Sequence, residues 1–523
     1  MSSKVAGGAV AEPSFDGRKL FTFLCMVFGM FMAILDIQIV SASLPEIQAG
    51  LGASRDDIAW VQTAYLIAEV IMIPLSGYLS RMLSTRWMFA ISAAGFTLMS
   101  MMCATATTIN EMIVWRALQG FIGGGMIPTV FASAYIIFPR EKFSVVSPMI
   151  GLVATLAPTI GPTLGGYLTE FGSWHWLFLI NVVPGILVTI AAVTLIDFDE
   201  PDWSLIDHFD WVGFASMAIF LGSLEFVLEE GAGDDWFQSE EILLFTVVSA
   251  TAAMIFFWRA FTAREPVVDL RAFSDKNFTM GCIFSFTMGI GLYGLTYLYP
   301  VYLSSVRGYN SLQIGETMFV SGAAMFLTAP IAGRLMSLLD PRVMMGIGFA
   351  GFGIGTWMVT GLTHDWDFWE LFVPQILRGC SLMICMVPIN NIALGMLPPS
   401  MIKNASGLFN LTRNLGGAVG LAVIGTVLTN RQDFHYARLS ESLNWSRPVV
   451  NETLNMMTGA YSSLGDLADK AGLKALSGIV TREAFVMSFA DVFYLLTWLF
   501  FALLFALFFV ERPKAMGGGG GGH

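Results

Sequence analysis

The chain has 523 residues, of which 55% are hydrophobic and only 13% are charged, with a net charge of −12. A soluble domain carries about 25% charged residues, so this composition excludes a water-soluble globular protein and predicts a surface that faces lipid. The net charge itself excludes little, because in a membrane protein the position of each charge carries more information than the sum.

Apolar windows recur along nearly the whole chain, and each provides the roughly 20 residues that a helix needs to cross a bilayer. The windows are continuously apolar rather than alternating, which indicates helices and not a β-barrel. We therefore predict an all-α membrane protein with fourteen transmembrane helices, at residues 21–45, 57–79, 87–106, 109–136, 144–168, 175–196, 209–229, 241–258, 278–304, 312–333, 343–361, 367–395, 404–429 and 486–510.

The positions of lysine and arginine predict the orientation of these helices. With both termini in the cytoplasm, 16 of the 27 basic residues fall in cytoplasmic segments, and only Arg55 and Arg307 fall in short outer loops. Six more lie in the long outer segment 430–485 and three lie within predicted spans. The bias supports the count of fourteen, because a miscount by one span would exchange the sides of all later charges.

The two halves of the chain repeat the same short patterns. A glycine followed by charged residues marks a short cytoplasmic loop in each half, at Gly77, Arg81 and Arg86 and again at Gly333, Asp340 and Arg342. An arginine within a span also recurs, followed later by a glycine-rich run: Arg116 with Gly161–Gly166, and Arg378 with Gly416–Gly420. The repeat distance corresponds to six spans plus two, which predicts two pseudo-symmetric six-helix bundles and two inserted helices.

This division predicts seven consecutive segments. They are a cytoplasmic N-terminal segment 1–20, a six-helix bundle 21–196, two inserted helices with linkers 197–277, five helices of the second bundle 278–429, a periplasmic loop 430–485, the last helix 486–512 and a Gly-rich cytoplasmic tail 513–523. The loop contains an amphipathic stretch at Tyr461–Leu476, and it is interpreted either as a docking element for a partner or as a folded cap without one.

Ionisable residues within spans are costly and are therefore functional candidates. Asp36 lies about midway along the first span, Glu69 lies deep in the second and Arg116 lies in the fourth. Glu69 is interpreted as a group that attracts a cationic drug or accepts a proton, or else as a structural hydrogen-bonding residue. We expect the remaining candidates to be mainly structural: Glu225, Glu229, Arg378, Arg413 and Asp491. The seventh span, which carries Glu225 and Glu229, is expected to lie at the periphery.

Several motifs resemble those of one transporter family. They are Ile34-Leu-Asp36 through Leu44-Pro45, Trp115-Arg-Ala-Leu-Gln-Gly120, Gly151 with Ala157-Pro158 and Gly161-Pro-Thr-Leu-Gly-Gly166, and Trp174-His-Trp-Leu-Phe-Leu-Ile-Asn181 with Pro184. Over residues 20–512 the chain resembles the major facilitator superfamily. Within it, the chain is similar to the fourteen-span drug:proton antiporters of the EmrB/QacA type, with more likeness to EmrB than to QacA.

The resemblance implies that the first and fourth helices are neighbours, so that Arg116 approaches Asp36. The pair would alternate between a charged, paired state and a separated, protonated state, with Glu69 as a further proton-coupling candidate. The alternative is a static pair that holds two helices together.

The resemblance also implies roles for backbone-shaping residues. Pro158, Gly161, Pro162, Gly165 and Gly166 belong to an antiporter motif that kinks and seals the fifth helix. Gating loops are expected at Gly77, Arg81, Gly333, Asp340 and Arg342. Ser80 and Arg81 stand where the family motif usually carries an acid, so this chain departs from the usual charge lock.

Polar residues inside spans predict a central cavity, lined by Gln38, Gln62, Asn390 and Asn391. The 31 Met and 43 Phe favour adaptable apolar binding. The five cysteines lie in apolar stretches and the five histidines are scattered, so we expect no disulfide, metal site or cofactor. Gly289–Gly294 has the spacing of a dinucleotide fingerprint, but it lies inside an apolar span without a preceding strand.

These observations and the resemblance predict a proton-driven exporter, and not an enzyme, that moves amphipathic or hydrophobic toxic compounds out of the cytoplasm or inner leaflet by alternating access. The resemblance implies a multi-pass location in a bacterial inner membrane. It implies small-molecule drugs, protons and membrane lipid as partners, together with an EmrA-like periplasmic adaptor and a TolC-like outer-membrane channel, and no nucleic acid. The alternative is a carrier of the same superfamily for a specific metabolite or siderophore.

Overall fold

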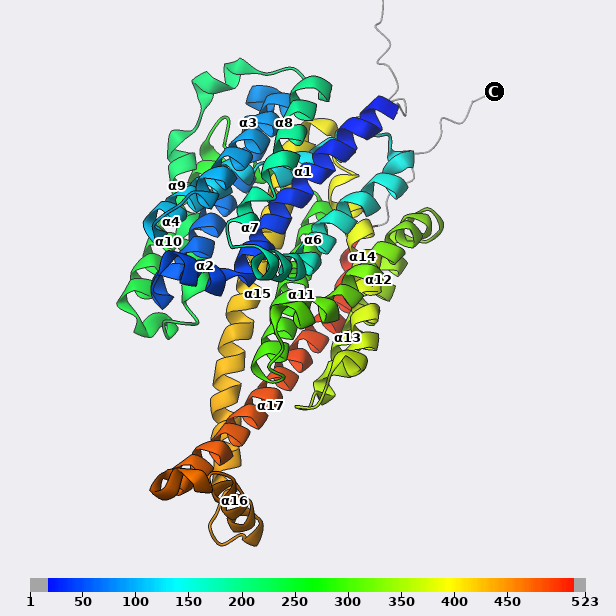
Figure 1. Ribbon diagram of the computed structural model, residues 1–523. Coiled ribbons are helices and arrows are strands. Elements are labelled where there is room, and N and C mark those ends of the chain that lie inside the picture. The colour runs from blue at the N-terminus through cyan, green and yellow to red at the C-terminus, as the bar shows by residue number, and fades with distance from the viewer. Residues whose placement is uncertain (1–16, 512–523) are drawn as a thin grey trace, which may run out of the picture.

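The computed structural model of the protein describes residues 17–511 as an array of long helices. Most of these helices run roughly parallel or antiparallel to one another (Figure 1). Every regular element within the described residues is helical, so the predicted all-α class is confirmed. The predicted tail 513–523 and residues 1–16 of the predicted N-terminal segment lie outside the described residues.

The first bundle is formed by α1 (Gly17–Ala42), α2 (Leu44–Leu51), α3 (Arg55–Ala104), α4 (Ile109–Gly123), α5 (Met126–Ile137), α6 (Phe143–Phe171), α7 (Trp176–Leu179) and α8 (Val182–Leu195). Helices α4 and α5 together make one span, and so do α7 and α8. Two inserted helices follow, α9 (Trp211–Glu230) and α10 (Glu240–Thr262). The second bundle contains α11 (Lys276–Ser305), α12 (Ser311–Leu338), α13 (Pro341–Met358), α14 (Phe368–Leu394), α15 (Pro399–Glu441) and α17 (Ala468–Ala506), with α16 (Pro448–Ala460) between the last two.

Helix α3 contains two of the predicted spans. Its 50 residues would extend about 75 Å as one straight helix, whereas the hydrocarbon core of a bilayer is only about 30 Å thick. The backbone leaves helical geometry at Ser84, where φ is 78°, and this break separates the spans predicted at 57–79 and 87–106. The described chain has 13 helices long and apolar enough to cross a membrane, and the broken helix among them makes two crossings, which gives the predicted fourteen.

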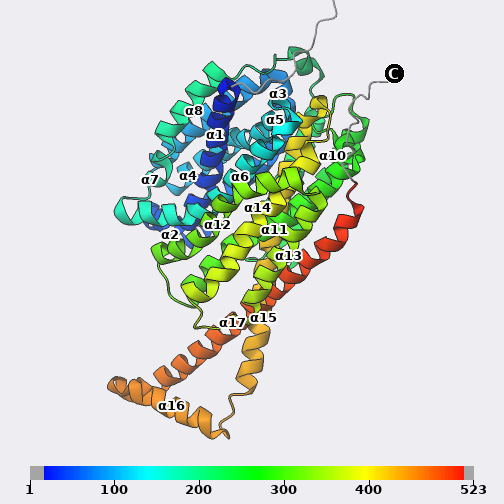
Figure 2. The ribbon, with the colours of Figure 1, turned by 90° about the vertical axis from the view of Figure 1, so that its right-hand side faces the viewer.

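Both ends of the described chain lie at one face of the bundle. Lys276, at the start of α11, pairs with Glu511 at 3.0 Å, and α1 begins at the same end of the molecule (Figure 1). We call this end the terminal face. Helices α15, α16 and α17 project from the opposite end (Figure 2), which we call the hairpin face.

The segment predicted as the long loop 430–485 is largely a helical hairpin. Helix α15 runs for 43 residues and α17 for 39, and a helix of 43 residues is about 65 Å long. Both helices therefore continue beyond the thickness of a bilayer. The amphipathic stretch at Tyr461–Leu476 becomes α-helical only at Ala468, after a 3-10 segment in which Gly465 has a φ of 56°.

Polar caps fix the helix starts at the hairpin face. Asn310 forms a capping box with Gln313 at the start of α12, and Asp367 forms one with Glu370 at the start of α14. Each box satisfies amide groups that the first helical turn leaves without partners. Hydrogen bonds from the Tyr309 hydroxyl and from backbone amide Phe368 lower the pKa of the Asp367 carboxyl below its ordinary value.

Two pairs of helices make the main contacts between the bundles. Helix α6 packs against α12, and α3 packs against α15. These pairs occupy corresponding positions in the two halves, since α3 and α12 each carry one copy of the repeated glycine loop and α6 and α15 each carry one glycine-rich run. The predicted pseudo-symmetry is therefore expressed in the contact between the bundles.

The inserted helices differ in their surroundings. Helix α10 packs mainly on α9, whereas α9 packs on both α3 and α15. Trp60 of α3 stacks on Phe226 with ring centroids 5.6 Å apart, and the Trp236 indole nitrogen donates to the Thr426 hydroxyl at 2.9 Å. The prediction that the seventh span lies at the periphery is therefore wrong, because α9 contacts one helix from each bundle.

Candidate functional site

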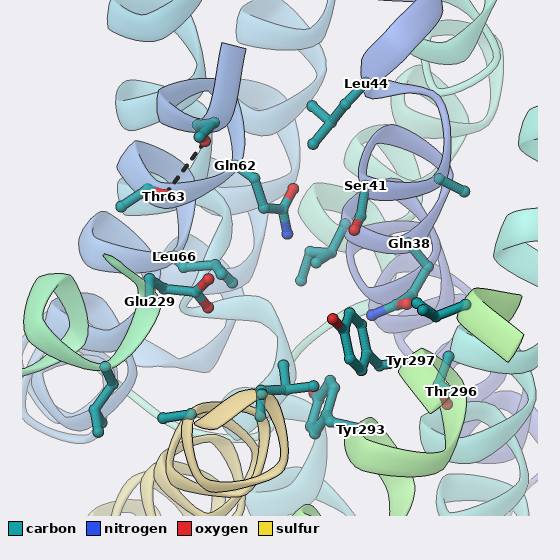
Figure 3. A pocket seen from close by; sticks show the side chains of 18 of the residues that line it. Gln38, Ser41, Leu44, Gln62, Thr63, Leu66, Glu229, Tyr293, Thr296 and Tyr297 are labelled. Atoms are coloured by element: carbon teal, nitrogen blue, oxygen red, sulfur yellow. Dashed lines mark hydrogen bonds between the residues drawn. The ribbon is translucent and has the colours of Figure 1, made fainter. Parts of the chain in front are cut away.

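A cavity of about 560 Å³ lies between the two bundles in their hairpin-side half (Figure 3). Its walls come from the hairpin-side ends of α1, α3, α9 and α11 and from parts of α6 and α15. Gln38 and Gln62 face it from different sides, and Tyr293 and Tyr297 lie on a third side. Apolar residues make up most of the remaining lining. The volume lies within the range of roughly 300–1,000 Å³ typical of sites for drug-sized ligands.

Asp36 and Arg116 form an ion pair inside the first bundle. Arg116 Nη1 lies 2.6 Å from Asp36 Oδ2, and both side chains have no exposed surface. The predicted approach of the fourth helix to the first is therefore observed. The pair does not line the cavity directly, but Ile37 and Gln38, the next two residues of α1, do.

Three further residues hold this ion pair. Asn181 donates to Asp36 Oδ1 at 2.7 Å, and Arg116 donates to Gln119 Oε1 at 2.8 Å. The guanidinium also lies 4.1 Å from the ring centroid of Tyr65. Asn181 and Gln119 were present in the motifs of the sixth and fourth spans, but sequence reasoning gave them no role. The sequence signal that could have identified them is a single amide side chain among apolar residues on each of these spans.

Glu69 lies near this network but has a different environment. Its side chain is buried, and its Oε1 has no hydrogen-bond partner among the described residues. It lines a small cavity of about 50 Å³ together with Glu225 and Glu229 of α9, and Glu229 also lines the large cavity. Three carboxyl groups from two spans, the second and the seventh, are thus brought together.

The predicted lining residues of the second half lie elsewhere. Asn390 and Asn391 are absent from the residues that line the large cavity, which corrects that prediction. Asn391 lies on the terminal side, where its side-chain oxygen accepts from the Ser147 hydroxyl at 2.7 Å and it lines a separate cavity of about 390 Å³. Asn390 is fully buried, with no hydrogen-bond partner for its side chain among the described residues. The large cavity therefore does not extend to the depth of these two residues.

The antiporter-motif residues fall on α6, which contains Pro158 and Pro162 in its interior. A β-carbon at Gly161 would collide with Gln38, and one at Gly165 would lie 2.9 Å from the Ile39 carbonyl oxygen. Gly166 is buried on the same helix. These glycines allow α1 and α6 to approach closely, and Pro162 contributes to the cavity wall.

The repeated loop glycines lie where the bundles touch at the terminal face. A β-carbon at Gly77 would lie 2.9 Å from Asn404 Cα, and one at Gly333 would collide with the Ser144 carbonyl oxygen. The hydroxyl of Ser406 also reaches across, donating to the Pro128 carbonyl at 2.9 Å. The terminal side is therefore closed, while the cavity lies on the hairpin side.

Lys403 and Asp199 connect the first loop to the second bundle, and neither belongs to the repeated loop pattern. Lys403 of α15 pairs with Asp199 and donates to the Ser80 carbonyl at 2.8 Å. Asp199 also accepts from the Thr85 amide at 3.0 Å. An acid from the linker after α8 thus pairs with Lys403 beside the first loop, where the guanidinium of Arg81 lies over the Tyr78 ring.

In the second copy of the loop, Asp340 caps α13 by accepting from the Arg342 amide at 2.9 Å. This contact between Asp340 and Arg342 is local to the start of α13, unlike the contact of Lys403 with Asp199.

The remaining charged candidates each have at least one local partner. Arg378 donates to the Ser321 hydroxyl, and Arg413 donates to Asn410. Asp491 of α17 pairs with Arg431 and contacts His435, both on α15, at the base of the hairpin. All five cysteines are free, and the described residues contain no group of three or more His, Cys, Asp or Glu suited to a metal ion.

Comparisons with known proteins agree with this architecture. The family description "Major Facilitator Superfamily" matches residues 26–421. The chain is 42% identical to "Colistin resistance protein EmrB" of Acinetobacter baumannii, a match that covers 96% of this chain and 99% of that protein. It is 30% identical to "Multidrug export protein EmrB" of Escherichia coli K12, over 98% of this chain and 99% of that protein.

Solved structures show the same fold at low sequence identity. The human organic anion transporter MFSD10 matches with a TM-score of 0.60 at 13% identity, over 93% of this chain and 100% of that chain. The proton:xylose symporter XylE matches with a TM-score of 0.56 at 12% identity, over 93% of this chain and 96% of that chain. With a family match across most of its spans and relatives that share its full length, this chain belongs to the major facilitator superfamily, as a multi-pass secondary transporter similar to EmrB proteins.

Proposed function

We propose that this protein is a proton-driven multidrug exporter that carries amphipathic or hydrophobic compounds across a bacterial inner membrane. The observation that carries the proposal is the buried Asp36–Arg116 pair, which lies one residue from the wall of a drug-sized cavity. The full-length likeness to proteins described as multidrug export and colistin resistance proteins supports export of toxic compounds.

The proposed cycle follows from the two faces of the molecule. With both termini in the cytoplasm, the terminal face is the cytoplasmic side, so the cavity lies on the outer side and the inner side is closed. Asp36 is paired with Arg116 in this conformation. A proton that enters from the outer side neutralises Asp36 and releases Arg116, so the contacts within the first bundle change and the bundles are free to rock. The proton then leaves to the cytoplasm as drug enters.

The function is tested by uptake into inverted membrane vesicles whose lumen is made acidic. A fluorescent lipophilic cation and, separately, a protonophore-like weak acid serve as probes. We expect the vesicles with this protein to accumulate at least one probe only while the pH gradient lasts. Accumulation that persists after the gradient is collapsed, or equal accumulation by vesicles without the protein, would contradict the proposal.

We further propose that the hairpin of α15, α16 and α17 contacts a periplasmic adaptor, which passes cargo to an outer-membrane channel. The hairpin extends beyond the bilayer, and its tip exposes several large apolar side chains: Trp445, Val449, Met456, Leu464 and Leu467. Exposed apolar surface of this kind marks an interaction site. The full-length likeness to EmrB proteins directs the proposal to an EmrA-like adaptor and a TolC-like channel.

Replacing residues 443–466 with a short Gly-Ser linker is expected to leave transport across the inner membrane intact but to abolish resistance of intact cells. Helices α15 and α17 contact each other below the tip, so the shortened protein should fold and still accumulate probe in inverted vesicles. Resistance of intact cells should fall to the level of cells without the protein, because no adaptor is engaged. Unchanged resistance of these cells would exclude the hairpin tip as the docking element.

A further inference from the structure

The first inserted helix places two carboxylates beside the large cavity. Glu225 and Glu229 are one helical turn apart and therefore lie on the same face of α9. With Glu69 of α3 they line the small cavity of about 50 Å³. Ile37, Leu66, Tyr293 and Leu421 line both this cavity and the large one, so the carboxylates lie where two cavities adjoin. Figure 3 shows Glu229 pointing into the large cavity from the wall opposite Gln38.

These carboxylates have few partners within the protein. Glu69 is 2% exposed and Glu225 is 5% exposed, yet Glu69 Oε1 and Glu225 Oε2 have no hydrogen-bond partner among the described residues. A buried polar atom without a partner costs free energy and requires an explanation. Glu230, the next residue along α9, is different, because it accepts from the Thr63 hydroxyl at 3.0 Å.

Acidic groups outnumber basic groups near the cluster. The residues that line the two cavities include four glutamates and no lysine or arginine. Arg413 and Arg116 act electrostatically on Glu69. However, Arg413 donates to Asn410 and lies 5.2 Å from the centroid of the Phe131 ring, and Arg116 pairs with Asp36. Arg116 balances Asp36, whereas the partner of Arg413 is a neutral amide, so one uncompensated arginine lies near four glutamates and acidic groups remain in excess.

Aromatic rings complete the chemistry of the space. Tyr293 lines both cavities, and Tyr297 lines the larger one. Cations are attracted to the faces of such rings, and the mainly apolar walls accommodate hydrocarbon groups. A neutral or anionic compound would gain nothing from the carboxylates, and an anion would be repelled by them.

We propose that Glu225 and Glu229 of the inserted helix α9, together with Glu69, form a binding site for the positively charged group of lipophilic organic cations. The site rests on the proposed exporter function and specifies its substrate class. It assigns a role to α9 that a six-plus-six bundle would lack, since this helix packs on α3 and α15 and presents two carboxyl groups to the cavities. The charged group of the substrate lies among the carboxylates, and its apolar part extends toward Tyr297.

The site is tested by equilibrium binding of two probes of similar shape and opposite charge, tetraphenylphosphonium and tetraphenylborate, to the purified protein in lipid nanodiscs. The Glu225→Gln/Glu229→Gln variant should bind tetraphenylphosphonium about tenfold more weakly or worse, equivalent to about 1.4 kcal/mol. Its affinity for tetraphenylborate should stay the same or increase. Glu240→Gln is the matched control, because this glutamate is exposed at the start of α10, away from the cavity.

Three outcomes would overturn the site, and the first two concern tetraphenylphosphonium binding alone. The first is unchanged tetraphenylphosphonium affinity in the double variant, and the second is the absence of tetraphenylphosphonium binding by the parent protein. The Glu225→Asp/Glu229→Asp variant keeps both charges and should retain affinity, so a loss of affinity in both double variants would indicate a packing effect and not charge recognition. Because no pH gradient is used, failure here leaves proton-driven export intact, and failure of export leaves this binding measurement intact.

Discussion

The Asp36→Asn substitution should abolish accumulation driven by a pH gradient in inverted vesicles, for every probe that the parent protein accumulates. Asparagine keeps the shape of the side chain but carries no proton in exchange for drug. Arg116 would remain fully buried beside a neutral amide, and removing one partner of a buried pair typically costs about 3–5 kcal/mol. The variant is therefore also expected to unfold at a lower temperature than the parent protein, measured by thermal denaturation in nanodiscs.

A second substitution separates coupling from structural support. In the Asp36→Asn/Arg116→Gln variant both charges are gone, and Gln119 and Asn181 remain as hydrogen-bonding neighbours. We expect thermal stability to recover most of the loss, because no uncompensated charge is left in the bundle. Proton-driven accumulation should not recover. If the double variant regains both stability and accumulation, the pair is a static support and the coupling group lies elsewhere.

Much of the fold follows from the sequence because the bilayer imposes simple rules. Continuous apolar runs, charge bias and the repeat at Gly77 and Gly333 were sufficient to predict fourteen crossings and two related bundles. The break at Ser84 was not a distinct signal, but the charged loop around it, with Arg81 and Arg86, indicated that the chain turns there. Helix lengths were less predictable, since α15 and α17 continue past their apolar segments as a helical hairpin.

The candidate site was only partly predictable from the sequence. A charged residue in an apolar run is conspicuous, so Asp36, Arg116 and Glu69 were identified. Their partners were not, because a lone amide such as Asn181 has the same appearance whether it contacts a charge or fills space. The position of α9 between α3 and α15 could not be predicted, because it depends on tertiary contacts. The apolar pattern of the inserted helices shows only that they cross the membrane. The same limit applies to Lys403 and Asp199, which lie far apart in the chain and meet only because the bundles close.

Closure of the terminal face should depend on the two loop glycines. Gly77→Leu and Gly333→Leu, singly or together, are expected to shift the protein away from the conformation described here. Their side chains would collide with the backbone of the opposite bundle at Asn404 and Ser144. Overpacking of this kind costs about 1–3 kcal/mol, and a free-energy difference of that size changes a conformational equilibrium by about 5- to 150-fold.

The shift can be measured from both sides in a variant without the five native cysteines. A Ser406→Cys reporter lies between the bundles at the closed face and is 1% exposed, so its labelling by an impermeant maleimide from the terminal side should increase. A Gln62→Cys reporter in the cavity should label more slowly from the hairpin side, because the bundles close there as they separate at the terminal face. Gly361→Leu is the control, since a β-carbon at Gly361 would contact nothing within 4 Å. Faster labelling at both reporters would indicate general loosening, and unchanged labelling at both would show that the glycine contacts do not control closure.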